Sequence, residues 1–556
     1  MEKTTDTMEK IVALCKRRGF VFQGSDIYGG LKGTWDLGPL GVTLNNNLKQ
    51  EWWKMFVDGR EDMYGLDAAI LMNEKVWEAS GHTGAGFSDP IVICQNCNSR
   101  YRADHLIEDE EMLKKIQIGI SKTFKEFFDE QESLVDFIQK EQLEQNVVFG
   151  KYIDEKAFSL TEKNYFKEFY VNFSSEIFRY LDVDIEYSEG VELVNHNLEE
   201  CVNKALSNFD NFLKPAQLHY LLQFVKCKNK GCGKSVWTPP KDFNLMFETK
   251  VGAQGDMKSY LRPETAQGIF VNFKNVVDTM SPKMPFGIAQ IGKAFRNEIA
   301  PREFLFRVRE FEQMEIEYFV REEEWESEFE KLRHDIHTWH AHIGLSESNI
   351  REYEVPENDL AHYSKRTIDF EYNYPGKGFD ELAGFAYRTD HDLKNHEEAS
   401  GTKMRYVPAD GVPFIPHVLE PSFGVGRALT AVLCEAYTED QMNDDVRTYL
   451  KLPKHLAPYR VAVSPLLKNK PQLVEKAREV FQMLKAEFGN VAWDDNGNVG
   501  KRYRRQDEIG TPACVVIDFE TLGQEAPELA DTVTVRNRDT GEQERVAITE
   551  LAEYLK

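Results

Sequence analysis

Residues 295–318 read FRNEIAPREFLFRVREFEQMEIEY. Side chains of a β-strand alternate between two faces, and residues 304–320 predict such a strand. One face would be mostly apolar and interrupted by two acids: Phe306, Val308, Glu310, Glu312, Met314, Ile316 and Tyr318. The other face would carry charged and polar side chains on both sides of the aromatic residue Phe311: Arg307, Arg309, Phe311, Gln313, Glu315 and Glu317. A solvent-exposed face rarely needs arginines, an aromatic ring and carboxylates in one register, so this face predicts a binding site.

The side chains of that face suit two kinds of ligand. Arginine binds phosphate in bidentate fashion, and an aromatic ring can stack on a base. A buried carboxylate can hold an ammonium group. The strand therefore predicts a site for a nucleotide and an amine-bearing substrate. The sequence contains no GxxxxGK[ST] phosphate loop, so arginines on a sheet would have to hold the phosphates.

A second segment, EPSFGVGRALTAVLCEAY (420–437), predicts the end of a strand followed by a helix. Glu420 and Ser422 would share one face of the strand. Gly424 and Gly426 would permit a tight turn, and Arg427 would lie in the first turn of an apolar helix. An ordinary strand–turn–helix with a surface arginine has the same pattern, so this segment alone is weak evidence for a site.

Composition narrows the class of protein. The chain has 556 residues, with 93 acidic and 68 basic side chains and a net charge of −25. Hydrophobic residues make up 41%, which allows packed cores and argues against disorder. No uninterrupted apolar run reaches about 18 residues, and the N-terminus lacks a secretory pattern. We therefore expect a cytoplasmic, water-soluble protein without a membrane span.

The length suggests about three or four domains. Residues 1–104 mix helix and turn signals, and 105–225 predict a mostly helical insertion rich in Glu, Lys, Phe and Leu. Residues 226–455 are rich in strands, among them FGIAQIGKAF at 286–295. Residues 456–556 alternate strands and helices, which is typical of an α/β domain.

Two sets of residues have metal-ligand character. A helix near 331–342 carries His334, His337, His340 and His342. No cysteine or paired carboxylate frames these histidines, so a surface helix is the favoured interpretation. The spacings Cys94-x2-Cys97 and Cys227-x4-Cys232 bracket the insertion and suit a structural tetrahedral zinc site. Four reduced thiols remain the alternative.

The motifs together resemble a known family. FRNE with FRVREFEQMEIEY resembles motif 2 of the class II aminoacyl-tRNA synthetases, and GVGRALTAVL resembles motif 3. A helix after Gly38-Pro39-Leu40-Gly41 stands where the dimer-forming motif 1 would lie. LRPETAQGIFVNF (261–273) and EPSFGVGR narrow the resemblance to the dimeric glycyl-tRNA synthetases, over about 1–103 and 226–556.

The resemblance implies an α+β fold. Its parts would be an antiparallel sheet flanked by helices, the helical insertion and a C-terminal α/β anticodon-binding domain. It implies that ATP and Mg²⁺ activate glycine to glycyl-adenylate, that tRNA(Gly) receives the glycyl group, and that the chain forms a homodimer. A synthetase-like accessory or regulatory protein without aminoacylation is the alternative. Activation of serine, threonine, proline or histidine is a third interpretation, which the acidic residues beside Ser422 disfavour.

The resemblance also implies roles for single residues. Arg296, on the α-phosphate, and Arg427, on the γ-phosphate, would be the catalytic pair, and Phe311 would stack on adenine. The implied ATP-binding residues are Arg296, Asn297, Glu298, Phe306, Arg307, Val308, Arg309, Glu310, Phe311, Glu381, Leu382, Gly424, Val425, Gly426 and Arg427, with Glu381 and Leu382 also near Mg²⁺.

The implied glycine-binding residues are Arg102, Glu264, Phe311, Glu312, Gln313, Met314, Glu315, Glu420, Pro421, Ser422, Phe423 and Gly424. Of these, Glu264, Glu315, Glu420 and Ser422 match the family's contacts to glycine. The basic run Lys501–Arg505, expected in a loop between strands, would supply the tRNA contacts Arg502, Arg504 and Arg505.

Overall fold

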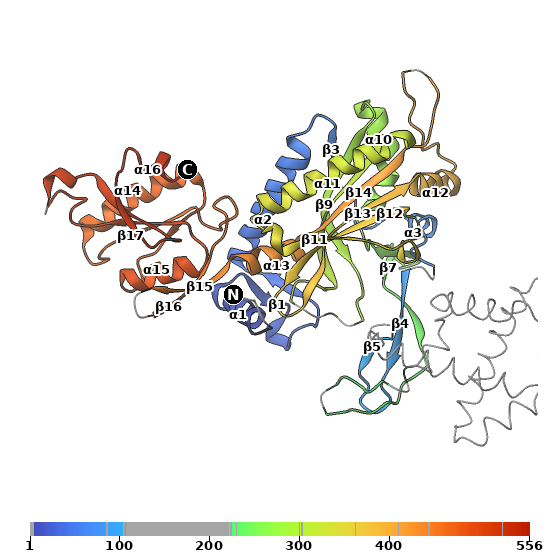
Figure 1. The fold of residues 1–556 in the computed structure, drawn as a ribbon, viewed down its shortest axis with the longest axis horizontal. Helices are drawn as coiled ribbons and strands as arrows, with labels where there is room; N and C mark the ends of the chain where they lie inside the picture. Colours follow the sequence, from blue (N-terminus) through green and yellow to red (C-terminus); the bar gives the residue numbers. More distant parts are fainter. Residues whose placement is uncertain are drawn as a thin grey trace, which may run out of the picture. The chain divides into compact units, whose positions relative to one another are not determined.

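A computed structural model describes residues 5–84, 87–103, 106, 222, 225–229, 231–299, 301, 304–361, 363–409, 411–442, 445–524 and 526–556 (Figure 1). The chain divides into two compact units, Met1–Gly84 with Met246–Lys556 and Ala85–Leu245. The helical insertion predicted at 105–225 lies outside the described residues, apart from three single positions.

A large sheet forms the centre of the first unit. Among the described residues it has seven strands in the order β11-β12-β13-β14-β10-β9-β3. Their bounds are β3 (Met63–Gly65), β9 (Phe286–Phe295), β10 (Glu310–Val320), β11 (Ile350–Glu354), β12 (Arg366–Tyr374), β13 (Gly378–Thr389) and β14 (His417–Gly424). All neighbours pair antiparallel except β3, which runs parallel to β9. The predicted antiparallel sheet and the strand at 286–295 are confirmed.

The strand predicted at 304–320 is shorter than expected, because β10 begins only at Glu310. Phe304 has a left-handed backbone with φ of 55°, and its ring packs edge-on against Trp35 with centroids 5.3 Å apart. Phe304, Leu305 and Phe306 are buried in the core. Core packing of three consecutive apolar side chains requires a turn, since a strand would send alternate residues to opposite faces.

The two faces of the sheet are covered by different helices. One face packs against α1 (Thr5–Arg18), α2 (Pro39–Trp53), α11 (Trp325–His342) and α13 (Val425–Ala436). The other packs against α10 (Ala266–Met280), and α12 (His391–Ser400) adds Leu393 to this second core. In α2, a Cβ at Gly41 would lie 1.9 Å from the Phe20 carbonyl oxygen, so only glycine fits there.

Helix α11 is amphipathic and not purely a surface helix. His334, His337 and His342 are exposed, whereas His340 is buried. Burial lowers the pKa of His340 to about 3, so this ring is neutral. His337 Nε2 lies 2.6 Å from Glu352. Within the described part of the chain the four histidines form no common metal cluster.

The C-terminal residues form a second sheet, in the order β18-β17-β19-β20-β21. The strands are β17 (Val461–Pro465), β18 (Val491–Trp493), β19 (Ala513–Ile517), β20 (Thr532–Asn537) and β21 (Gln543–Ala547). Strand β17 runs parallel to both neighbours, and the remaining pairs are antiparallel. The helices are α14 (Pro471–Phe488), α15 (Val499–Glu508) and α16 (Leu551–Tyr554). The predicted C-terminal α/β domain is confirmed.

The basic run Lys501–Arg505 lies within α15 and not in a loop. Asn498 caps the helix by accepting a hydrogen bond from the Lys501 backbone N–H at 3.0 Å. Arg502 is only 3% exposed and donates to the carbonyl oxygens of Pro465, Asp495 and Gly497. Arg505 pairs with Asp494 at 2.6 Å. Of the three arginines predicted to contact tRNA, Arg502 and Arg505 therefore stabilise their own domain.

The remaining strands form small sheets. In the first unit these are β1 (Val21–Gln23) with β2 (Trp35–Leu37), β7 (Phe247–Val251) with β8 (Met257–Leu261), and β15 (Tyr437–Met442) with β16 (Asp445–Leu450). The second unit contains β4 (Ser88–Ile93), β5 (Arg100–Arg102) and β6 (Lys241–Asn244) in the order β5-β4-β6. No helix in the described ranges is long and apolar enough to cross a membrane.

Candidate active site

One face of the large sheet carries a buried polar cluster on neighbouring strands. Strand β10 pairs with β14 so that Glu315 lies opposite Ser422. Ser422 Oγ donates to Glu315 at 2.9 Å, and Gln313 Nε2 donates to the same carboxylate at 3.2 Å. Thr265, from the turn before α10, also donates to Glu315. The predicted residues Gln313, Glu315 and Ser422 therefore converge at one point.

Arg388, at the end of β13, supplies positive charge within this cluster. It is 2% exposed and forms two 2.8 Å hydrogen bonds to Asp392 of α12 and a third to Glu420 of β14. Burial alone would lower the pKa of Arg388, but the two carboxylates outweigh burial and raise it well above its ordinary value. The guanidinium therefore stays charged.

Three carboxyl groups crowd together beside Arg388. Glu315, Glu317 and Glu420 each place an oxygen within 4.8 Å of the others. Burial, reinforced by repulsion from neighbouring carboxylates, raises the pKa of all three, that of Glu420 to about 8. Glu317 is fully buried, and neither of its oxygens has a hydrogen-bond partner among the described residues. Such a cluster favours a cationic ligand over an anionic one.

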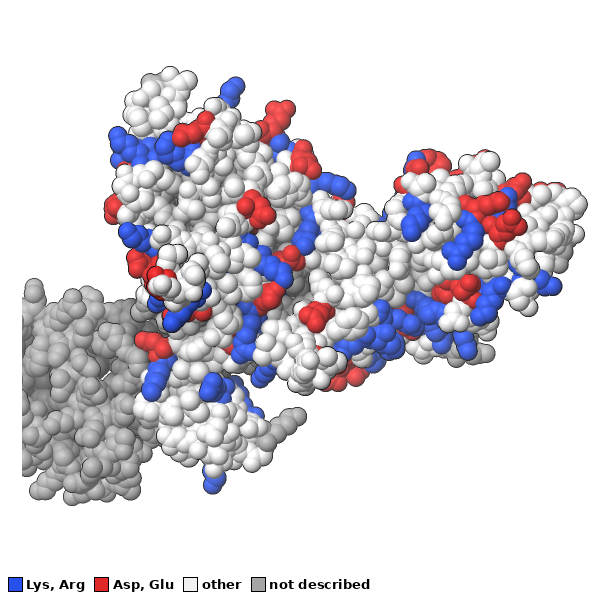
Figure 2. Space-filling view, turned by 180° about the vertical axis from the view of Figure 1, so that it is seen from behind, with Lys and Arg blue, Asp and Glu red and all other residues white. Residues whose placement is uncertain are grey.

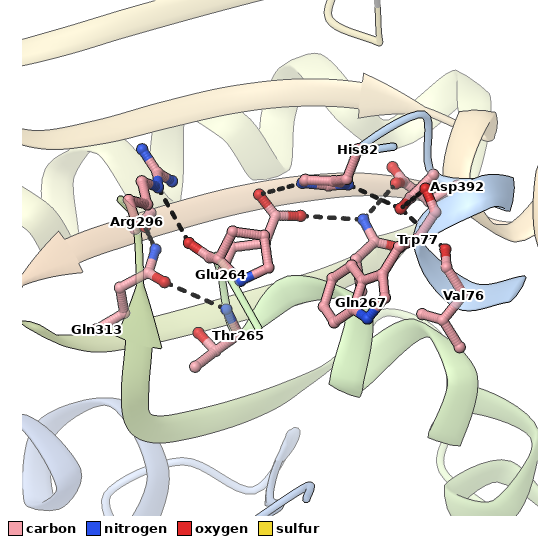
Figure 3. A network of polar contacts seen from close by, with 12 residues as sticks. Val76, Trp77, His82, Glu264, Thr265, Gln267, Arg296, Gln313 and Asp392 are labelled. Carbon is pink, nitrogen blue, oxygen red and sulfur yellow. Dashed lines mark hydrogen bonds and ion pairs between the residues drawn. The ribbon is translucent and has the colours of Figure 1, made fainter. Parts of the chain in front are cut away.

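Glu264 approaches the same region from the turn before α10 (Figure 3). Its carboxylate lies 3.4 Å from His82 Nε2 and accepts a hydrogen bond from Gln267 at 3.0 Å. Gln267 also donates to Asp392 at 3.0 Å. Although burial works to raise it, His82 and Arg388 hold the pKa of Glu264 below its ordinary range. Glu264 is therefore ionised.

Of the two predicted catalytic arginines, Arg427 pairs with Glu381, and the charge of Arg296 acts on the same carboxylate. Arg427, in the first turn of α13, lies 2.7 Å from Glu381 of β13, and its guanidinium stacks over Phe306 at 4.5 Å. Arg296, just after β9, stacks over Phe311 at 5.5 Å. Both arginines lower the pKa of Glu381, Arg427 more strongly. The two guanidinium groups therefore act within one region.

Arg296 connects this region to the acidic cluster. Its Nε donates to the Pro263 carbonyl oxygen at 3.0 Å, one residue before Glu264. Figure 3 shows Arg296, Gln313, Thr265 and Glu264 along one side of the network. A phosphate held by the arginines and an ammonium held by the carboxylates could thus belong to one substrate complex.

Close packing at position 426 requires a glycine. A Cβ there would lie 2.9 Å from the Leu305 carbonyl oxygen. The turn at 304–306 therefore packs directly against the start of α13, where Arg427 lies. A larger residue would push this helix end away from the sheet.

Asp369 of β12 is a further acid near Glu381. Burial, and then the charges of Glu381 and Glu371, raise the pKa of Asp369 to about 7. Carboxylate oxygens that share negative charge in this way are the ligands that Mg²⁺ uses in proteins. Glu381 and Asp369 therefore fit a divalent cation at the arginine end of the site.

Several predicted site positions direct their side chains elsewhere. Met314, Leu382, Phe423 and Val425 lie in the hydrophobic core, because they occupy the apolar register of their elements. Glu312 contacts α2 through Asn45 and Lys49 at 2.9 and 2.8 Å. Any ligand contact from the four core positions would have to come from the main chain.

Other predicted residues have local partners. Glu310 pairs with Lys293 at the exposed start of β10, and Phe306 and Val308 are buried. Arg309 donates to the carbonyl oxygens of Lys32 and Glu298. Arg102 belongs to the second unit, where it pairs with Asp89 at 3.1 Å.

The four paired cysteines converge in the second unit. Cys94 and Cys232 have their Sγ atoms 3.6 Å apart, as have Cys97 and Cys227, and all four Sγ atoms lie within 4.8 Å of one another. These separations exceed a disulfide bond. They match the ~3.8 Å expected between thiolates on a tetrahedral zinc with 2.3 Å bonds. The donor set therefore fits structural zinc.

The comparisons with known proteins agree with this architecture. Residues 247–437 match the family described as tRNA synthetase class II core domain (G, H, P, S and T), and residues 460–556 match that described as anticodon binding domain. The chain is similar to "Glycine--tRNA ligase" of Deinococcus radiodurans, with 42% identity over 577 residues that cover 99% of this chain and 98% of that protein.

"Glycine--tRNA ligase" of Thermus thermophilus is also 42% identical over 581 residues, with the same coverage. Among solved structures, prolyl-tRNA synthetase of Giardia lamblia in complex with prolyl-adenylate matches 99% of this chain and 77% of its own, with a TM-score of 0.56. At 13% identity this last similarity supports the fold alone.

The unpartnered carboxyl of Glu317 leads to a prediction about stability. Because burial raises its pKa, Glu317 takes up a proton on folding. As the pH rises from the unfolded pKa toward the folded pKa, the free energy of unfolding should therefore fall by about 1.4 kcal/mol per pH unit. Glu317→Gln has no such proton. Its stability relative to the wild type should therefore rise as the pH increases above the ordinary pKa of a glutamate, as measured by thermal unfolding.

The exposed residue Glu553, which is paired with Lys556, provides the matched control. Glu553→Gln should follow the wild-type pH dependence. If the Glu317→Gln and wild-type curves also run parallel, Glu317 is ionised in the folded protein.

Proposed function

Because the chain belongs to the glycine–tRNA ligase family of class II aminoacyl-tRNA synthetases, we propose that the site on β10, β13 and β14 activates glycine with ATP and passes the glycyl group to the 3′ end of tRNA(Gly). The observation that supports this most strongly is that Arg427 pairs with Glu381 at 2.7 Å and that Arg296 donates to Pro263, next to Glu264, at 3.0 Å, so that both arginines lie near the buried acidic cluster. One end of the site suits phosphates and the other suits an ammonium group.

In the first step the glycine carboxylate attacks the α-phosphorus of ATP, and pyrophosphate leaves. The attacking group is already an anion, so no general base is required. The protein has to align two anions and stabilise the charge that develops between them. Arg296 would hold the α-phosphate and the carboxylate, Arg427 the γ-phosphate, and Phe311 the adenine ring. In the second step the terminal ribose hydroxyl of tRNA attacks the carbonyl carbon of the glycyl-adenylate, AMP leaves, and the hydroxyl proton is released.

Glu381, together with Asp369, would hold Mg²⁺. When bound, the cation supplies positive charge to the phosphate oxygens of ATP. In the structure the guanidinium of Arg427 forms an ion pair with Glu381. This guanidinium would turn toward the phosphates when ATP binds.

Glycine is recognised through its ammonium group and its size. Glu264, Glu315, Glu420 and Ser422 would surround the ammonium, while Arg388 compensates part of their charge. Glycine has no side chain to bind, so selectivity must come from a lack of space at the α-carbon. Every competing amino acid is larger, and steric exclusion therefore works in the favourable direction.

Glycine-dependent ATP–pyrophosphate exchange tests this function. We expect exchange with glycine and none with serine, threonine, proline or histidine. Arg296→Ala and Arg427→Ala should each lower the rate by about 10²–10³, because each removes a fixed positive charge from the reacting phosphates. Arg405→Ala, which breaks an exposed pair with Glu397, is the control and should keep the rate. A complete lack of exchange by the wild type would favour an accessory protein, and exchange with another amino acid would reject the glycine assignment.

We propose that Cys94, Cys97, Cys227 and Cys232 bind one structural zinc ion. Four thiolates would leave no open coordination position, so zinc would stabilise the second unit and take no part in catalysis. Metal analysis of the purified protein should find about one zinc per chain. Cys97→Ser should lose it, whereas Cys514→Ala, which alters a buried thiol outside the quartet, should keep it. A wild-type protein without zinc would reject the site.

We propose that α15 contacts tRNA through the exposed residues Lys501 and Arg504, while Arg502 and Arg505 hold the helix in place. Figure 2 shows Lys and Arg side chains along an edge of the C-terminal domain, although the whole chain is acidic. Lys501→Gln with Arg504→Gln should weaken tRNA binding and reduce the salt dependence by about one unit per lost phosphate contact. Lys476→Gln, on α14, is the control. If the wild type, the double variant and Lys476→Gln bind tRNA with equal affinity and equal salt dependence, the proposed contact is rejected.

We propose a homodimer that uses the loop between β1 and β2. Ile27 and Tyr28 are 89% and 87% exposed, and Leu31 is 55% exposed. Large apolar side chains exposed together favour a protein partner, and α2, at the motif 1 position, follows this hairpin directly. Ile27→Glu with Tyr28→Glu should give a monomer in light scattering, whereas Leu467→Glu, an exposed apolar site in the C-terminal domain, should not. A wild-type monomer would contradict this assembly.

We place the enzyme in the cytoplasm.

A further inference from the structure

His82 lies beside the acidic pocket, in the turn that follows α3 (Glu74–Ala79). The imidazole is 8% exposed. Its Nδ1 lies 2.8 Å from Ser80 Oγ, and its Nε2 lies 3.4 Å from the Glu264 carboxylate. Its ring packs edge-on against Trp77 with centroids 5.5 Å apart. Figure 3 shows His82 between Glu264 and the Val76–Trp77 backbone. The ring is therefore fixed on several sides.

Glu264 needs such a partner because other acids surround it. The titratable or charged groups that act on it or respond to its charge are His82, Glu315, Tyr363, Arg388, Asp392 and Glu420. Without a donor, repulsion from the neighbouring carboxylates would turn Glu264 away or protonate it.

Among the described residues, the Glu264 carboxylate has two side-chain partners, His82 and Gln267. Gln267 is a neutral amide that also contacts Asp392 and His396, so it orients Glu264 without adding charge. An ionised carboxylate only accepts hydrogen bonds. At 3.4 Å, the Nε2 atom of His82 can stabilise this carboxylate only in a form of the ring that carries a proton there, and Ser80 Oγ holds the opposite ring nitrogen at 2.8 Å.

We propose that His82 is a positioning residue for glycine selection, which keeps the Glu264 carboxylate ionised and directed at the site of the substrate ammonium. This inference rests on the proposed function, in which Glu264 binds that ammonium. His82 itself does not touch the substrate. Its contribution is confined to the glycine end of the site, since Arg296 and Arg427 hold the phosphates independently.

Two variants of similar length separate a hydrogen-bond role from a packing role. His82→Met fills the space but has no N–H, whereas His82→Gln retains an N–H donor. In ATP–pyrophosphate exchange, His82→Met should raise the KM for glycine by about tenfold to a hundredfold, the range for loss of a hydrogen bond to a charged group. The KM for ATP should change less than twofold. His82→Gln should recover most of the loss in glycine KM.

The pH profile gives a second readout that packing alone would not change. Glu264 loses its charge as the pH falls through its folded pKa, which His82 lowers. Removal of the donor raises that pKa, so the acid limb of kcat/KM for glycine should move to higher pH in His82→Met. The limb should return toward the wild-type position in His82→Gln. Ser80→Ala, which frees only the far side of the ring, should shift the glycine KM in the same direction by a smaller factor.

Two controls make failures distinguishable. His337→Ala removes a histidine–glutamate pair outside the pocket and should match the wild type. Glu264→Gln tests the pocket itself: an unchanged glycine KM would reject the proposed glycine site and the role of His82 with it. If Glu264→Gln raises the glycine KM while His82→Met stays within twofold of the wild type, only the His82 inference is overturned. An equal rise in both KM values, or equal losses in His82→Met and His82→Gln, would also overturn it.

Discussion

The ion pairs of Arg388 make the buried acidic cluster on the large sheet possible. A sheet face can bury several carboxyl groups only if positive charge is buried with them, since an unpaired buried charge is strongly unfavourable. Arg388 provides that charge to Asp392 and Glu420, but one guanidinium cannot also balance Glu264 and Glu315, and Glu317 is buried in its protonated form. An incoming ammonium would supply the missing positive charge. A small ligand with an amino group would therefore stabilise this acidic cluster most.

The alternation of β10 divides the sheet between stability and chemistry. Met314 and Ile316 pack into the core, while Gln313 and Glu315 face the pocket. A shift of one residue would exchange the two sets. Pairing with β9 and β14 over most of the strand prevents such a shift. The same pairing brings the end of β14, and with it Arg427 at the start of α13, to the arginine end of the site.

The sequence predicted the residues that lie on regular elements or in local motifs. Strand alternation placed Glu315 on the charged face of β10 and Glu420 with Ser422 on one face of β14, and the resemblance to motifs 2 and 3 singled out Arg296 and Arg427. Arg388 and His82 were not predicted as site residues, because each meets its partners only after the chain has folded: His82 and Glu264 are 182 positions apart. The expected strand start near 304 was wrong because core packing of Phe304 overrides local pattern. The loop expected at Lys501–Arg505 was wrong because the Asn498 cap was not recognised.

The central claim is that the arginines and the buried acids form one site that holds the two halves of a single intermediate. A crystal structure with a non-hydrolysable glycyl-adenylate analogue tests it most directly. The account predicts the ammonium group within hydrogen-bond distance of Glu264, Glu315 or Glu420, and the phosphate replacement in contact with Arg296. An analogue bound elsewhere, or one whose amino group points away from these carboxylates, would contradict it.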